Sequence, residues 1–473
     1  MKAKVRTKYL NSPPLFLFIA IFASIGIYFV INSFAATTSC TAATTSTFTS
    51  VFNAAQPGST ICLASGTYTF GGGNKALPGV TITSQSGAAA SFKNFVLTQP
   101  NSYNGTFTAS GITFDGVNID GAEICAPAHD LTFKNLSFTQ QVVVRQSGGA
   151  GSCGDSGNLI NSNITFDNDH FDNINAIANT PEGRVHLYGD NIGTGTNQLI
   201  GLTIKNSTFS GGTTDGIQNG ANGVQIINNK FVNIIDCGCG PHTDSIQLYG
   251  SSNTLVKNNY FYNDSDGVVS FDPAQTNDKI INNIIHVNGP NALVLASDQG
   301  TEVAHNTVIN YAILYGSKTG QQGSANLKIQ NNISAGVGLN GGTNTNLTSD
   351  HNMWPGAVSP NIPGSPQYVG TIGAASSSTS YPLASYALKS TSPGYHAASD
   401  GTDVGADVSQ VGPAATGATT TKPGDTNNDN VVNIIDLSTL LSKWNTNYTA
   451  ADFNKDNTVN IFDLSILLSN YGK

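Results

Sequence analysis

Two loops near the C-terminus place oxygen-bearing side chains at regular positions. The loops begin at Asp425 and Asp452, and each leads into an apolar segment with helical spacing, LSTLLSKW and LSILLSNY. Side-chain oxygens at positions 1, 3, 5, 9 and 12 of such a loop, with the backbone carbonyl of position 7, are the ligands that surround Ca²⁺. The predicted ligands of two Ca²⁺ ions are Asp425, Asn427, Asp429, Val431, Asn433 and Asp436, and Asp452, Asn454, Asp456, Thr458, Asn460 and Asp463.

The paired loops resemble a type I dockerin over residues 424–473. This resemblance implies a small all-α calcium-binding domain and a cohesin-type protein partner. Asn430 and Asn457 stand at position 6, where glycine is usual, and asparagine tolerates the left-handed conformation of that turn. Positions 10 and 11, which often help dockerins to choose a partner, are apolar here. An acidic tail without metal and a calcium-stabilised module that packs on its own chain are the alternatives.

A second group of acidic residues begins three similar phrases, DGIQNGAN, DSIQLYGS and DGVVSFDP. If these phrases are strands on successive turns of one coil, Asp215, Asp244 and Asp266 lie about 5 Å apart per step. Carboxylates this close repel, so they raise a pKa or require a cation. We therefore predict a catalytic group of Asp244, Asp215, Asp266 and the nearby His242, which performs acid–base chemistry or holds a further Ca²⁺. The alternative is that each aspartate only accepts backbone N–H groups in a turn.

The residues that follow these acids predict a binding surface. Alternation places Leu187, Ile217 and Ile246 in one inward column, and their neighbours then point outward. Aromatic rings beside amide groups suit a sugar chain, which combines apolar ring faces with hydroxyl groups. An ordinary solvated face is the alternative. The predicted substrate-binding residues are Arg184, His186, Tyr188, Gln218, Gln247 and Tyr249.

These phrases belong to a long repeat array. Phrases such as ITFDGVNI, LTFKNLSF, ITFDNDHF and LTIKNSTF recur without helical segments between them, which predicts strands stacked as a solenoid. The array resembles a right-handed parallel β-helix, so we expect an all-β domain over residues 37–410, with a short helix near residues 47–70 covering its first turn. A β-propeller is the structural rival. An asparagine ladder is expected from Asn135, Asn168, Asn206, Asn228, Asn258, Asn282 and Asn331.

The segment PHTDSIQLYGSSNTLVKNNY, at residues 241–260, resembles the NTDGID region of polygalacturonases, which belong to the pectin lyase-like superfamily. The resemblance implies a catalytic role for Asp244. The later His-Gly and Arg-x-Lys elements of that family have no clear counterpart. Two functions therefore compete: an exported enzyme that degrades a polysaccharide, as a hydrolase or a lyase, and a non-catalytic cell-surface protein for glycan binding or adhesion. For a lyase, Ca²⁺ on the aspartates with His242, His186 or Arg184 as base would suit elimination.

The N-terminus predicts export. Four cations precede an apolar run from Leu15 to Ile31, so residues 1–36 form a signal peptide or a membrane anchor. Membrane contact is expected only through this segment if it is not cleaved, and the rest of the chain is placed outside the cytoplasm. Without those cations the net charge changes from −9 to −13, which excludes nucleic acid as a natural partner. Residues 411–423 are expected to form a flexible linker before residues 424–473.

Six cysteines in an exported chain indicate disulfides. Proximity favours the pairs Cys40–Cys62 and Cys125–Cys153. Cys237 and Cys239 are separated by one residue, so a direct bridge between them would be strained, and bonds to other turns or a metal are the alternatives.

Overall fold

The structure is a computed structural model, and it describes the chain in sixteen segments. The predicted signal or anchor, residues 1–36, lies outside them. Among the described residues, no helix is both long and apolar enough to cross a membrane. The segments are 40–71, 75–97, 109–125, 128–145, 162–176, 183–188, 201–238, 242–270, 275–317, 321–342, 344–377, 381–413, 424–426, 432–448, 450–453 and 458–471.

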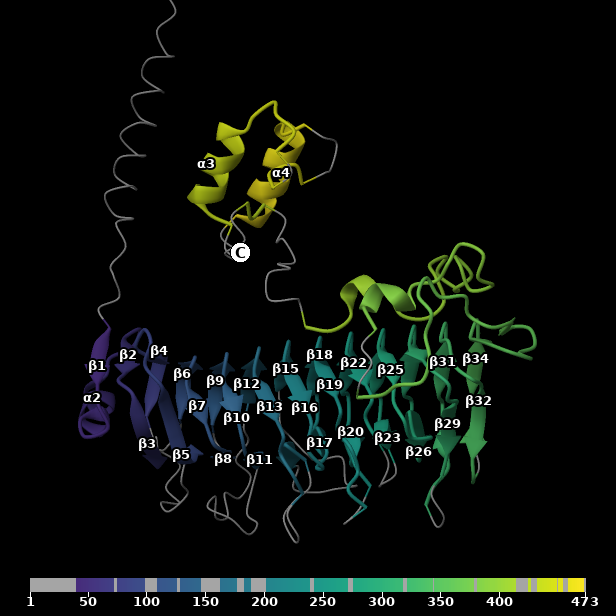
Figure 1. Ribbon diagram of the computed structural model, residues 1–473, viewed down its shortest axis with the longest axis horizontal. Coiled ribbons are helices and arrows are strands. Elements are labelled where there is room, and N and C mark those ends of the chain that lie inside the picture. Colours follow the sequence, from purple (N-terminus) through teal and green to yellow (C-terminus); the bar gives the residue numbers. More distant parts are fainter. Residues whose placement is uncertain are drawn as a thin grey trace, which may run out of the picture.

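The repeat array forms a parallel β-helix with three faces, and each turn of the chain passes through all three (Figure 1). Every strand pairs in parallel with the equivalent strand of the next turn, as the repeated phrases predict. The first face contains β1 (Thr41–Ala43), β2 (Thr60–Leu63), β4 (Ala76–Ser84), β6 (Ser110–Asp115), β9 (His129–Lys134), β12 (Ser162–Asp167), β15 (Thr203–Lys205), β18 (Gln225–Ile227), β21 (Leu255–Lys257), β24 (Lys279–Ile281), β27 (Glu302–Ala304), β31 (Lys328–Gln330) and β34 (Thr348–Asp350).

The second and third faces are joined because β5 pairs with both β7 and β8. The second face contains β3 (Gly66–Gly71), β5 (Ala90–Leu97), β7 (Asn118–Ile119), β10 (Ser137–Phe138), β13 (His170–Asp172), β16 (Thr208–Ser210), β19 (Lys230–Val232), β22 (Tyr260–Tyr262), β25 (Ile284–His286) and β28 (Thr307–Val308). The third contains β8 (Ala122–Cys125), β11 (Val142–Arg145), β14 (Val185–Tyr188), β17 (Ile217–Asn219), β20 (Asp244–Leu248), β23 (Asp266–Ser270), β26 (Leu293–Ala296), β29 (Ile313–Gly316) and β32 (Val337–Asn340). Short pairs β30 (Ser324–Ala325) with β33 (Asn344–Thr345) and β35 (Met353–Trp354) with β36 (Ile362–Pro363) complete the strands.

The interior of the coil is filled by stacked apolar side chains. Phe171, Phe209, Phe231 and Phe261 occupy one column, with ring centroids 4.6–4.8 Å apart and nearly parallel planes. This spacing equals the distance between paired strands, so identical side chains at identical positions stack without gaps. The inward side chains therefore hold successive turns in register and position the outward ones.

An asparagine ladder is present, but one residue after the predicted position. The predicted asparagines adopt the left-handed conformation, with φ between 53° and 59°. Asn168 donates to Asn135 and Asn282 to Asn258, whereas Asn206 donates to Asp167. The continuous ladder is formed by the fully buried residues that follow, with amide-to-amide distances of 2.9–3.1 Å. Its members are Asn229, Asn259, Asn283, Asn306, Asn332 and Asn352.

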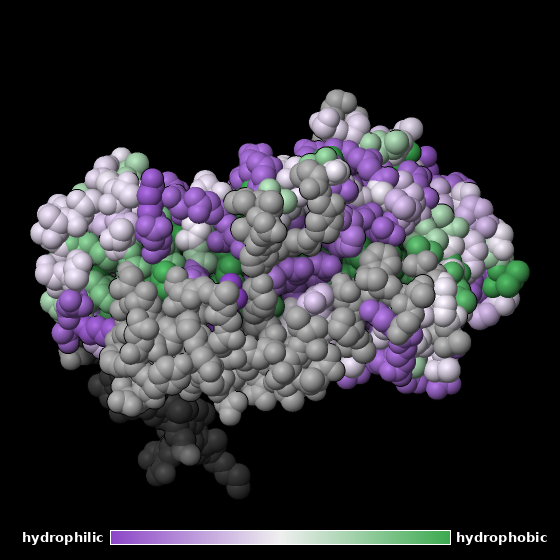
Figure 2. Space-filling view, turned by 90° about the horizontal axis from the view of Figure 1, so that it is seen from below, coloured by the Kyte–Doolittle hydropathy of each residue, from purple (hydrophilic) through white to green (hydrophobic). Residues whose placement is uncertain are grey.

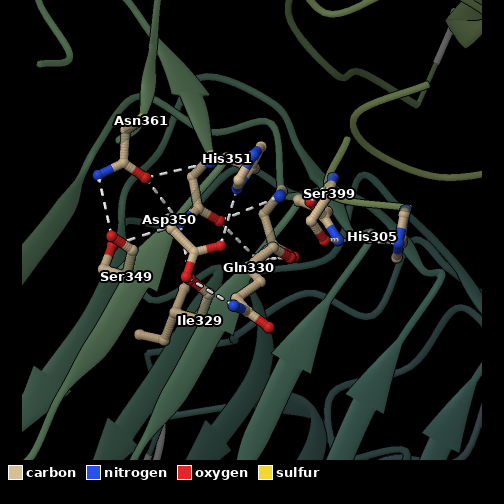
Figure 3. A network of polar contacts seen from close by, with 11 residues as sticks. His305, Ile329, Gln330, Ser349, Asp350, His351, Asn361 and Ser399 are labelled. Atoms are coloured by element: carbon tan, nitrogen blue, oxygen red, sulfur yellow. Dashed lines mark hydrogen bonds and ion pairs between the residues drawn. The ribbon is translucent and has the colours of Figure 1, made fainter. Parts of the chain in front are cut away.

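Both ends of the β-helix are closed by other parts of the chain. Helix α2 (Phe48–Ala54) packs Phe48 and Phe52 on the first turns, as the sequence predicts (Figure 1). At the other end, Asn361 accepts a hydrogen bond from Asn352, and Ser399 bonds to Asn331 (Figure 3). The returning segment contains two 3₁₀ helices, η1 (Leu383–Tyr386) and η2 (Val408–Gln410). Tyr386 of η1 packs on outward residues of β22 and β25.

The disulfide prediction is confirmed for Cys40–Cys62, which links the residue before β1 to β2. Cys125 and Cys237 are also disulfide-bonded, so Cys237 is not a metal ligand. Cys153 and Cys239 lie outside the described residues.

The C-terminal module contains two helices, α3 (Ile434–Ser442) and α4 (Ile461–Asn470). A small apolar core joins them, formed by Val432, Leu440, Ala451, Val459 and Leu467.

Candidate functional site

The three aspartates occupy equivalent positions on neighbouring turns. Asp244 of β20 pairs in register with Asp266 of β23. Ile217 pairs with Ile246, which places Asp215, two residues earlier, beside Asp244. All three side chains are buried. The predicted acidic column therefore exists, at the edge where the chain enters the third face.

His242 joins two of these acids. Its Nδ1 lies 3.1 Å from Oδ2 of Asp244, whose side chain is fully buried, whereas His242 is 44% exposed. The hydrogen bond that the imidazole donates to Asp244 raises the pKa of His242 to about 9, so the imidazole carries a proton at neutral pH. One donor atom from each of His242, Asp244 and Asp266 lies within 4.8 Å of the others. This set is compact enough to share a proton network or to hold one divalent cation.

Two of the acids also accept hydrogen bonds that stabilise the fold. Asp215 Oδ1 accepts the backbone N–H of Asp244 at 2.8 Å. Asp266 accepts the backbone N–H and the side-chain amide of Asn291, at 3.3 and 3.1 Å. These contacts match the alternative in which the aspartates stabilise turns. The structural role is clearest for Asp215, because its partner is the backbone N–H of Asp244 at the start of β20.

The predicted outward column is in register. His186 pairs with Gln218, Gln218 with Gln247, and Gln247 with Val269. Nε2 of Gln218 donates to Oε1 of Gln247, so the two amides form a short polar row. Tyr249 is half-buried, one residue beyond β20. The side chain of Tyr188 lies outside the described part of the structure.

Two details of the prediction are wrong. Arg184 does not face solvent: it is fully buried, and its guanidinium donates to the backbone carbonyls of Phe171 and Ser210, each at 2.9 Å. Burial lowers its pKa to about 10, so it remains charged and ties turns together instead of contacting a substrate. In the inward column, Val185 and not Leu187 pairs with Ile217.

The sequence prediction missed a charged pair on earlier turns of the same face. Glu123 of β8 pairs in register with Val143 of β11, which pairs with His186, so Glu123 continues the outward column. Arg145 Nε lies 3.1 Å from Oε1 of Glu123. Both line a cavity of about 640 Å³ that also contains Gln141 and Thr214. The phrases AEIC and VVVR are the sequence signal for this pair, because each alternates as a third-face strand does.

Figure 2 views the molecule from below, and hydrophilic and hydrophobic residues are both exposed on this side. A surface with polar hydrogen-bonding groups beside apolar groups can bind a polysaccharide. The protein is thus a parallel β-helix with an acidic, histidine-containing site on its third face.

The calcium loops are described in part. Asp436 and Asp463, at position 12 of each loop, are fully buried at the starts of α3 and α4. Each carboxylate accepts backbone N–H groups from positions 2 and 9 of its own loop, at 2.7–2.9 Å. Asp425 and Asp452 are also buried, and Asn433, Thr458 and Asn460 lie at their predicted loop positions. Asn427, Asp429, Val431, Asn454 and Asp456 lie outside the described residues.

Residues 423–470 match the family model of the dockerin type I domain. The chain is therefore a parallel β-helix protein with a C-terminal dockerin type I domain, and domains of this type bind calcium. No curated protein matches the chain at a significant level.

Several solved structures are similar in fold. Pectate lyase Pel9A is 15% identical over 76% of this chain and 90% of that chain, with a TM-score of 0.36. The PL6 family alginate lyase AlyGC is 12% identical over 77% of this chain and 58% of that chain, with a TM-score of 0.45. The Streptococcus pneumoniae surface protein and adhesin PfbA is 14% identical over 62% of this chain and 88% of that chain, with a TM-score of 0.44.

Proposed function

We propose that this protein is an exported, polysaccharide-degrading enzyme with its active site at His242, Asp244 and Asp266. The convergence of these three side chains within 4.8 Å supports the proposal most directly, because a solvated histidine beside buried carboxylates is a common arrangement for proton transfer. The outward row of His186, Gln218 and Gln247 would bind the sugar chain.

The reaction that fits this geometry best is glycoside hydrolysis with retention. Carboxyl groups about 5 Å apart suit a double displacement, whereas inversion needs about 6.5–9.5 Å to admit a water molecule. The groups in these two roles here would be Asp266 and His242, which have donor atoms within 4.8 Å of each other, closer to the first value than to the second. Asp266, the more accessible carboxylate, would attack the anomeric carbon as the glycosidic bond breaks, and protonated His242 would donate its proton to the leaving oxygen. Water would then displace Asp266 and release the sugar, returning a proton to the neutral His242. Asp244 would position His242 and maintain its charge.

Elimination is the second reaction that the site could support. A divalent cation held by His242, Asp244 and Asp266 would supply Lewis acidity next to a uronate carboxylate. His242 would then be a ligand and would no longer donate a proton. The products separate the two reactions, since hydrolysis creates reducing ends and elimination creates an unsaturated uronate that absorbs ultraviolet light.

The dockerin match supports attachment to a cohesin-type partner through calcium-dependent folding of residues 424–473. Attachment outside the cell agrees with the predicted export signal and with the disulfides at Cys40, Cys125 and Cys237.

A non-catalytic glycan-binding or adhesion protein is the alternative function. The hydrogen bonds from Asp244 to Asp215 and from Asn291 to Asp266 favour it, because they give two of the acids a structural role.

The variant Asp244→Asn tests the catalytic proposal. We expect turnover of a glycan substrate to fall by about 100-fold or more, with substrate binding retained. Loss of the carboxylate should also move the alkaline limit of residual activity from near pH 9 towards the ordinary histidine value near 6.5.

The matched control is Asp350→Asn, which disrupts another His–Asp pair, at His351, on the first face (Figure 3). It should leave turnover and its pH profile unchanged. Unchanged turnover in Asp244→Asn, with reducing ends and ultraviolet absorbance both measured, would favour the binding protein.

A further inference from the structure

The third face carries little positive charge. Its described strands contain three acids, Glu123, Asp244 and Asp266, and one basic residue, Arg145. Arg145 is already paired with Glu123. By contrast, strands of the first face contain five lysines, at positions 134, 205, 257, 279 and 328. The basic residues are thus concentrated on a different face from the candidate site.

The sequence of the segments next to this face has the same bias. Residues 146–161, 177–182, 189–200 and 271–274 directly precede or follow third-face positions, and they contain four acids but no lysine or arginine. The first basic residue in such a segment is Lys318, after β29, two turns beyond Asp266. The acids are Asp155, Glu182, Asp190 and Asp272.

A polyuronate carries one negative charge on every sugar. Sites for such polymers need cations, because a substrate carboxylate within several Å of protein carboxylates is repelled. This repulsion is stronger where the groups are buried. On and beside the described third face, Arg145, the buried Arg184 and His242 oppose Glu123, Asp215, Asp244 and Asp266. The local charge balance therefore opposes a polyanion.

The third face does offer groups that recognise hydroxyls. Gln218 is 9% exposed, and its Oε1 has no hydrogen-bond partner among the described residues. A buried amide oxygen without a donor is costly, and a sugar hydroxyl would satisfy it. Gln141 and Thr139 line the adjoining cavity, and Tyr249 stands at the end of β20.

We infer that the third face takes an uncharged polysaccharide and discriminates against polyuronates by charge. The inference rests on the proposed function, since it names the substrate class of the same site. It defines the glycan by hydroxyl-rich, neutral chemistry and leaves the individual sugar to experiment.

Affinity electrophoresis of the full exported chain tests the inference. Gels would contain galactan, arabinan, xylan, mannan or β-glucan as neutral polymers, and polygalacturonate or alginate as polyuronates. We expect at least one neutral polymer to bind about tenfold or more tightly than either polyuronate at about 20 mM NaCl. Raising the salt to about 200 mM should strengthen any residual polyuronate binding, because screening weakens repulsion.

The variant Glu123→Gln sharpens the test by releasing Arg145 from its partner. Polyuronate retention should increase several-fold, and by a larger factor than retention by the neutral polymer. Glu302→Gln is the matched control, since Glu302 is paired with Lys279 and Lys328 on the first face and should affect neither. Melting temperatures would show that both variants fold.

Tighter binding of a polyuronate than of every neutral polymer, directly or only with added Ca²⁺, would overturn the inference, as would retention by no neutral polymer. Failure of the catalytic proposal has a different signature. If Asp244→Asn retains full turnover, or the wild type has none, the enzyme proposal fails, while the measured order of retention still decides the substrate class.

Discussion

Three aspartates in the interior of the β-helix have pKa values raised to neutrality or slightly above. Asp264, Asp278 and Asp298 are fully buried or nearly so, and each accepts a hydrogen bond from a serine hydroxyl. Burial raises the pKa of Asp264 and Asp278 to about 7 and that of Asp298 to about 8. Asp298, which has the highest of these pKa values, keeps its proton at neutral pH and serves as a neutral hydrogen-bonding group.

Asp298 should make stability depend on pH. In the unfolded chain its carboxyl ionises near pH 4, whereas in the folded protein it keeps its proton to about pH 8. Raising the pH between these values favours the unfolded state, so stability present in mild acid is lost as pH rises through the folded pKa. We expect the wild type to lose about 2 kcal/mol of unfolding free energy through Asp298 between pH 6 and 8. The variant Asp298→Asn should not show this loss.

Urea unfolding at both pH values would measure this effect. The comparison of variant with wild type cancels other titrating groups, including His242. An equal decline in stability for both proteins would show that Asp298 is already ionised in the folded state.

At the scale of the elements, the asparagine ladder holds the first and second faces together. Asn283 Oδ1 accepts from the backbone and side-chain N–H groups of Asn259, and its Nδ2 donates to Asn306 and to the carbonyl of Val256. Asn283→Ala leaves these buried groups without partners. We expect a loss of about 3 kcal/mol of unfolding free energy.

The control for the ladder is Asn326→Gly. Asn326 is an exposed left-handed residue, with φ 57°, in an outer turn, and glycine adopts that conformation freely. It should change stability by less than about 1 kcal/mol. Chemical denaturation of both variants would compare the positions, and equal losses would contradict the distinction between buried ladder and outer turn.

The repeated strands could be predicted from sequence because their alternation is visible in single phrases. The position of the ladder could not, because the phrases contain paired asparagines such as Asn258–Asn259 and Asn282–Asn283. The first asparagine of each pair forms the turn and the second is buried. Because both are asparagine, the residue type alone does not tell which one belongs to the ladder. Arg184 was misplaced for a similar reason: an arginine is expected outside, unless several backbone carbonyls converge on it, and only the folded chain shows that convergence.

At the scale of the whole molecule, the β-helix and the dockerin domain obtain stability by different means. The β-helix has a continuous interior from Ala43 to Ile329, whereas the dockerin domain has five buried apolar residues in its core. So small a core needs additional stabilisation, which bound metal supplies. The two parts should therefore respond differently to removal of Ca²⁺.

Chelation of Ca²⁺ should unfold residues 424–473 and leave the β-helix intact. The two tryptophans allow each part to be followed, since Trp444 packs against the dockerin core and Trp354 lies in β35 of the β-helix domain. In a Trp354→Phe background, EDTA should shift the Trp444 emission to longer wavelength, and excess Ca²⁺ should reverse the shift. In a Trp444→Phe background, EDTA should leave the Trp354 emission unchanged.

The variant Asp463→Ala should raise the Ca²⁺ concentration needed for the Trp444 response about tenfold or more, because it removes the buried carboxylate that joins the loop to α4. The control variant Ser469→Ala should leave this concentration unchanged. A Trp444 signal indifferent to chelator would mean that the module folds without metal.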